Sequence, residues 1–129
     1  MKRTLGLTLL LFATLFSCMR QEKPLPAELS RAESVMWEHP DSALSILRSM
    51  PQSSLSSGKN YATWALLLAQ ARDKVYGKRL PDSLNIPSSD KLVQDAMDYF
   101  EKEGDLKRMA QTYYYKGQLL KDQKEITEA

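Results

Sequence analysis

The sequence has only one cysteine, Cys18, and only one histidine, His39. A single cysteine excludes a disulfide within the chain, and a single histidine excludes the paired-histidine motifs of metal sites. The sequence also lacks a glycine-rich phosphate loop and a nucleophile elbow. His39 precedes Pro40, a position that favours a turn. We therefore predict a protein that is not an enzyme and that holds no metal and no cofactor.

Glu101, Glu103 and Asp105 form an acidic cluster around Gly104. Paired carboxylates can act as acid and base in catalysis. Here, however, the glycine is expected to end one helix, and Asp105 can cap the next by accepting a backbone N–H. A solvated helix end with a cap explains the cluster more simply than a catalytic pair.

The chain also lacks an excess of positive charge. It has 18 basic and 16 acidic residues, and Lys2 and Arg3 at the N-terminus account for the whole difference. A strong positive field is the main source of affinity for nucleic acids. The neutral remainder of the chain therefore excludes nucleic acid as the expected partner.

Long apolar runs are limited to residues 5–16. This run is too short to cross a bilayer as a helix, which takes about 20 apolar residues. It follows Lys2 and Arg3 and ends at Ser17 and Cys18, which is the layout of a secretory signal. We predict that residues 1–17 are a signal peptide and do not belong to the fold.

The end of this segment resembles the lipobox of bacterial lipoproteins, and the residues that carry the resemblance are Leu15, Phe16, Ser17 and Cys18. The resemblance implies a lipid-modified Cys18 that anchors the protein in the cell envelope, facing the periplasm or the cell surface. Met19 stands where some bacteria read an aspartate as an inner-membrane retention signal, which favours the outer membrane. Residues 18–26 are predicted to form a tether. A chance cysteine that ends an ordinary signal peptide is the alternative.

Apolar residues recur with helical spacing in five segments, and no segment alternates as a strand would. The segments are residues 27–38, 42–50, 59–76, 91–103 and 106–121, and a sixth begins near Glu125. We predict an all-α domain over residues 27–129, with its longest loop at 77–89. The sixth segment has at most five residues, too few for a stable helix. We therefore expect the helical domain to continue past Ala129.

The last two long segments contain residues that match a repeat. Ala96 and Phe100 fit the Ala-x-x-x-aromatic pattern of a second repeat helix, and Tyr113 and Gly117 fit the aromatic and small positions of the next first helix. This register resembles the tetratricopeptide repeat. The resemblance implies stacked antiparallel helical hairpins that form an α-solenoid. Because glycine weakens a helix, Gly117 is expected to let a neighbouring helix approach closely.

Three consecutive tyrosines, Tyr113, Tyr114 and Tyr115, point about 100° apart on a helix and cannot all face one interface. We expect Tyr113 to be in the core. Tyr114 and Tyr115 are the candidates for contact with a partner, because tyrosine combines apolar area with a hydroxyl group.

These features favour a lipid-anchored, non-enzymatic scaffold that binds an unknown protein or peptide. One alternative is the extracytoplasmic sensory region of a longer membrane signalling or transcription regulator. Another is a glycan-binding surface lipoprotein, for which Trp37, Trp64 and the tyrosine run would supply the aromatic platform.

Overall fold

The computed structural model describes residues 23–77 and 88–128 of the chain. The predicted signal peptide, Cys18 and Ala129 lie outside the described residues, as does most of the predicted tether and of the predicted loop.

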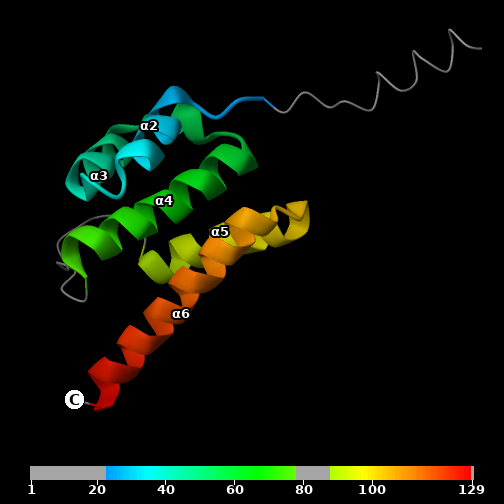
Figure 1. The fold of residues 1–129 in the computed structure, drawn as a ribbon. Helices are drawn as coiled ribbons and strands as arrows, with labels where there is room; N and C mark the ends of the chain where they lie inside the picture. The colour runs from blue at the N-terminus through cyan, green and yellow to red at the C-terminus, as the bar shows by residue number, and fades with distance from the viewer. Residues whose placement is uncertain (1–22, 78–87, 129) are drawn as a thin grey trace, which may run out of the picture.

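The described part of the chain is all-α, as predicted, and contains no strand. Its elements are α2 (Ala27–Val35), α3 (Pro40–Ser49), the 3-10 helix η1 (Gln52–Leu55), α4 (Gly58–Tyr76), α5 (Ser89–Glu103) and α6 (Leu106–Glu128). Figure 1 shows α4 between the α2–α3 hairpin on one side and the α5–α6 hairpin on the other. Each helix packs against its neighbours in the sequence, and α4 also contacts both α2 and α6.

Helix α4 is the centre of the fold. Every residue from 62 to 72 is buried, because other helices cover α4 on several sides. Its core side chains include Leu66, Leu67 and Leu68, none of which is accessible to solvent. Trp64 donates its indole N–H to the carbonyl oxygen of Leu47 on α3, at 2.9 Å. The apolar surface of α4 thus joins the two hairpins into one core.

Side chains and glycines fix where the helices begin and end. The hydroxyl oxygens of Ser57 and Ser88 accept backbone N–H groups at the starts of α4 and α5, and a carboxylate oxygen of Asp105 does so for α6 at 3.0 Å. Gly77 and Gly104 follow α4 and α5 with φ of 56° and 72°, a conformation that side chains disfavour. The predicted cap at Asp105 and the predicted helix end at Gly104 are confirmed.

The predicted break before a sixth helix is wrong, because α6 runs without interruption to Glu128. The sequence after Gly117 contains neither proline nor glycine, so nothing in it ends the helix.

The first helix is shorter than predicted and ends at Val35. Helix α3 begins earlier than predicted, at Pro40. Proline suits the first turn of a helix because no backbone N–H is needed there.

The predicted close approach at Gly117 is also wrong. This glycine is exposed, and a Cβ atom placed on it would meet nothing within 4 Å. The tight contact is at Gly58 instead, where a Cβ atom would come within 2.9 Å of the Tyr99 ring on α5. Glycine therefore allows α4 and α5 to approach at the first residue of α4.

The two glycines of the α5–α6 hairpin should respond to alanine in opposite ways. Gly117→Ala is expected to raise the free energy of unfolding by about 0.5–1 kcal/mol, because alanine favours the helix and meets no neighbour. Gly104→Ala is expected to lower it by about 1–2 kcal/mol, because a side chain strains the left-handed conformation. Urea denaturation checks both values. A loss of stability in Gly117→Ala would show that another segment packs on this glycine.

Candidate binding groove between α4 and α6

The three tyrosines of α6 lie differently from the prediction. Tyr115 is 8% exposed, whereas Tyr113 and Tyr114 are 50% and 60% exposed. The buried line of α6 contains Arg108, Thr112 and Tyr115, spaced four and three residues apart, so Tyr115 is the tyrosine that faces the core. Tyr113 is not a core residue, and Tyr115 offers little surface to a partner.

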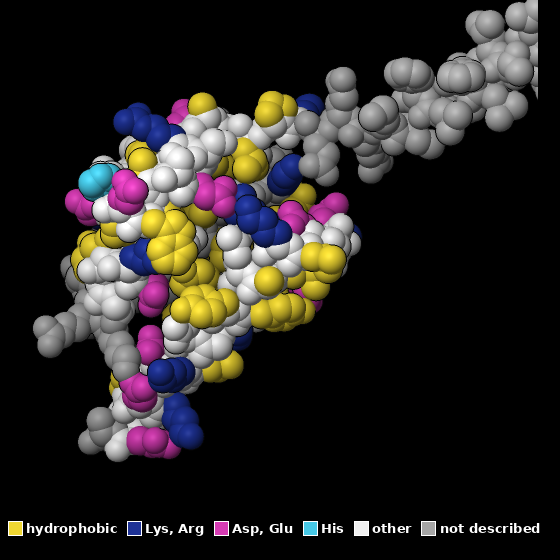
Figure 2. Space-filling view, viewed as in Figure 1, with side chains coloured by type: hydrophobic (Ala, Val, Ile, Leu, Met, Phe, Trp, Pro, Cys, Tyr) yellow, Lys and Arg dark blue, Asp and Glu magenta, His cyan; other side chains and the backbone are white. Residues whose placement is uncertain are grey.

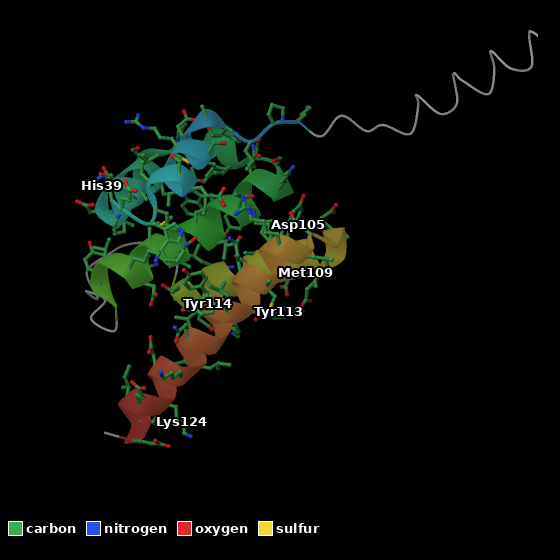
Figure 3. All side chains as sticks on the ribbon, viewed as in Figure 1. His39, Asp105, Met109, Tyr113, Tyr114 and Lys124 are labelled. Atoms are coloured by element: carbon green, nitrogen blue, oxygen red, sulfur yellow. The ribbon has the colours of Figure 1, made fainter. Side chains whose placement is uncertain are left out.

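Figure 3 shows that Tyr114 lies on the side of α6 that faces α4, while Tyr113 lies on the other side. The Tyr113 hydroxyl donates to Glu101 on α5, and this bond raises the pKa of Tyr113. Tyr114 accepts a hydrogen bond from the amide of Gln118 at 3.0 Å. Of the two tyrosines proposed for partner contact, only Tyr114 has an exposed ring.

A groove runs between α4 and α6, and residues of α5 line part of it. Its first part, the Trp37 cavity, has a volume of about 350 Å³ and is lined by Trp37, Gln70, Asp73, Lys74, Ala110, Gln111, Tyr114 and Tyr115. Its second part, the Ile126 cavity, has a volume of about 220 Å³ and is lined by Ala69, Asp73, Gly77, Ser89, Val93, Tyr115, Gln118, Leu119, Asp122, Gln123 and Ile126. Asp73 and Tyr115 line both cavities and therefore mark the point where they meet.

Trp37 forms one wall of the groove. It follows α2, is 75% exposed, and lies with the Lys74 ammonium 3.5 Å from its ring centroid. This cation–π contact holds a large ring at the surface opposite Tyr114. Figure 2 shows hydrophobic side chains over α2 and over α6 on this face, with both acidic and basic side chains between them. Trp64, the other tryptophan considered for a glycan platform, is buried and not available to a ligand.

An ion pair ties α2 to α6 beside the groove. The Arg108 guanidinium donates to both carboxylate oxygens of Glu33, at 2.7 and 3.0 Å, and to the side-chain oxygen of Gln111 at 3.2 Å. The hydrogen bond from Arg108 lowers the pKa of Glu33. Because the pair joins residues 75 positions apart, it ties the N-terminal hairpin to the first part of α6 beside the groove.

Asp73 has the least favourable environment of the groove's charged groups. Burial raises its pKa, and the carboxylate of Asp122 on α6 raises it further, against a smaller opposite effect of Lys74. Asp73 also lies in the last turn of α4, where the helix dipole disfavours a negative charge. Its carboxylate makes no hydrogen bond or ion pair with the residues that the structure describes.

Tyr115 closes the floor between the two cavities. Burial raises its pKa to about 12, and the nearby charge of Asp73 adds to this effect. The hydroxyl of Tyr115 therefore stays protonated at physiological pH and remains a hydrogen-bond donor at the centre of the groove.

The remaining residues singled out in the sequence lie outside the groove. Ala96 and Phe100 are buried within α5, and His39 lies in the turn before α3. Over residues 23–77 and 88–128, no group of three or more histidine, cysteine or acidic side chains could hold a metal ion. In the same ranges, no helix combines the length and the apolar character that a membrane span requires.

Comparisons of the chain with protein-family models, with curated proteins and with solved structures gave no match.

Asp73→Asn is expected to stabilise the protein at pH 7 by less than about 1 kcal/mol, because it removes a partly buried charge for which the described residues provide no partner. The change is stabilising because the raised pKa of Asp73 means that the fold disfavours its charged form. Protonation of the native Asp73 removes the same cost, so the gain shrinks as the pH falls through that pKa and vanishes in acid. Urea denaturation at pH 7 and pH 3 measures both effects. The control Asp98→Asn, at an exposed position on α5, should change stability by less than about 0.5 kcal/mol. Destabilisation by Asp73→Asn at pH 7 would refute this account of Asp73.

Proposed function

We propose that this protein is a lipid-anchored, non-enzymatic scaffold of the bacterial cell envelope, and that it binds a protein or peptide in the α4–α6 groove. The observation that carries the proposal is the pair of exposed aromatic rings, Trp37 and Tyr114, on opposite walls of a groove. Large exposed rings are rare on surfaces that face only water and are frequent in binding sites, where they supply most of the affinity.

The packing order of the helices supports a tetratricopeptide-like arrangement. Each helix contacts its neighbours in the sequence, and α2, α4 and α6 lie successively side by side. In stacked helical hairpins, the first helices of successive repeats form a continuous surface for ligands. The α4–α6 groove lies on the corresponding helices here. Ala96 and Phe100, which carry the resemblance to the repeat, are buried as such packing requires.

Tyr113 and Gly117, the other two residues of that resemblance, are exposed on α6. They lie on one line with Leu106, Ala110 and Leu120, spaced three and four residues apart. No helix of the described residues packs on this line, so Tyr113 and Gly117 do not add support for the repeat arrangement. In our proposal Tyr114 belongs to the ligand surface.

The rigidity of the walls supports binding to a preformed groove. The Arg108–Glu33 pair and the Lys74–Trp37 contact hold three helices and one aromatic ring in place without a ligand. Preorganised walls reduce the entropy that is lost on association. The partner thus meets a surface whose aromatic rings are already positioned.

The double variant Trp37→Ala/Tyr114→Ala tests the binding function, because it removes both exposed rings and neither of them is a core residue. In a pull-down from envelope extract with the purified protein, proteins recovered by the unchanged chain should be lost from the double variant. Truncation of a central aromatic contact typically costs about 2 kcal/mol or more, which is at least a tenfold loss of affinity.

Leu106→Ala is the matched control, since Leu106 is 77% exposed and lies outside both cavities. It should recover the same proteins as the unchanged chain. Recovery of no specific protein by the folded chain, or equal recovery by the double variant, would refute a binding function for the groove.

Cys18→Ala tests the anchor. The unchanged protein is expected to fractionate with membranes and to incorporate an alkyne-labelled fatty acid, because acyl chains on Cys18 add about 0.8 kcal/mol for each buried methylene. The variant should lose the label and leave the membrane fraction. A variant that stays in the membrane fraction without the label would argue that something other than a lipid holds the protein there.

A further inference from the structure

The charge at the centre of the groove indicates which kind of partner it suits. Asp73 lies where the two cavities meet, and no basic side chain of the described residues forms a hydrogen bond or an ion pair with it. The Lys74 ammonium lies 3.5 Å from the centroid of the Trp37 ring, and Arg108 is engaged by Glu33 and Gln111.

The nearest side chains on α6 do not compensate the charge of Asp73 either. Asp122 lines the same cavity and adds a second negative charge, and Lys116 is paired with Asp90 on α5 at 2.8 Å. A carboxylate that forms no salt bridge with the described residues therefore lies at the centre of the groove, next to two aromatic rings. A cationic side chain fits these surroundings, because it pairs with the carboxylate and is also attracted to aromatic faces.

The Ile126 cavity adds an apolar subsite next to Asp73. Ala69, Val93 and Leu119 supply its walls, and Ile126 stands at its edge with 67% of its side chain exposed. Such a cavity binds an aliphatic or aromatic side chain by removing its apolar surface from water. Asp73 and Tyr115 line the Ile126 cavity as well as the Trp37 cavity. Side chains that are close together in a partner can therefore reach both the carboxylate of Asp73 and the apolar subsite.

We infer that the partner of the α4–α6 groove is a protein segment that places a lysine or arginine side chain on Asp73 and a neighbouring apolar side chain in the Ile126 cavity. This inference rests on the proposed binding function and specifies its ligand. Segments with an acidic side chain in place of the basic one are rejected, because that side chain would be repelled by the carboxylate of Asp73.

An array of synthetic hexapeptides tests the inference. One position carries arginine, lysine, glutamine or glutamate, and a neighbouring position carries leucine or serine. The fluorescently labelled protein should bind peptides with a basic residue beside leucine most strongly. In Asp73→Asn the preference for arginine over glutamine should fall about tenfold, which corresponds to the loss of one charge-assisted hydrogen bond.

Three further variants separate the contributions of the Asp73 charge, the apolar subsite and the Trp37 ring to peptide binding. Asp98→Asn makes the same change of charge at an exposed site outside the groove and should keep the preference for basic residues. Ile126→Glu should weaken the preference for leucine over serine, and Trp37→Ala should weaken binding of all peptides.

The outcomes distinguish the inference from the proposed function. Binding that depends on Trp37 but shows no basic preference, or a preference that survives in Asp73→Asn, overturns the inference and leaves the groove as a binding site. An equal loss of preference in Asp73→Asn and Asp98→Asn overturns it as well, because the charge effect is then not local to the groove. If no peptide binds any form of the protein, both the inference and the proposed peptide-binding function fail.

Discussion

The burial of α4 is the constraint on which the rest of the structure depends. A helix whose residues 62–72 are all buried needs neighbours on several sides, and the two hairpins supply them. The hydrogen bond from Trp64 to Leu47 and the one from Tyr61 to Asp95, both at 2.9 Å, then fix α4 to α3 and to α5. Because α4 lies in the middle, its last turn faces both Trp37, which follows α2, and α6. This position puts Asp73 and Lys74 in the groove.

Much of the fold could be predicted from the sequence, because apolar spacing and helix-breaking residues are local signals. The boundaries of α4 and α5 follow from apolar faces that end at Gly77 and Gly104, and both glycines have a positive φ. The end of α6 could not be predicted in this way, since few side chains of its C-terminal half are buried and the helix continues there largely through helix propensity.

The candidate site was harder to predict, because it depends on which face of each helix turns inward. Three adjacent tyrosines give no indication of which one is buried, and only the packing of α6 on its neighbours selects Tyr115. Trp37 did carry a signal. The buried side chains of this first segment, Leu29, Ala32 and Met36, recur three and four residues apart, and Trp37 falls outside that series. Asp73 carried no such signal. Its neighbours come from two helices, and only the folded chain shows that the described residues offer its carboxylate no partner.

Two of these positions contribute little to the stability of the domain. The carboxylate of Asp73 has a raised pKa in the last turn of a helix, and the tryptophan Trp37 keeps most of its surface in water. Both line the same groove. Local departures of this kind are expected where a protein binds something, since the partner supplies the missing contact. The coincidence of these features in one place is the main reason for locating function between α4 and α6.

Site-specific photo-cross-linking in living cells tests the location of the binding surface most directly. A photoreactive phenylalanine analogue replaces either Tyr114, on the wall of the groove, or Leu106, which is more exposed on α6 but lies outside the groove. The account predicts a discrete cross-linked product with another protein from position 114 and none from position 106. Cross-linking from position 106 alone would contradict it, because the binding surface would then lie outside the α4–α6 groove.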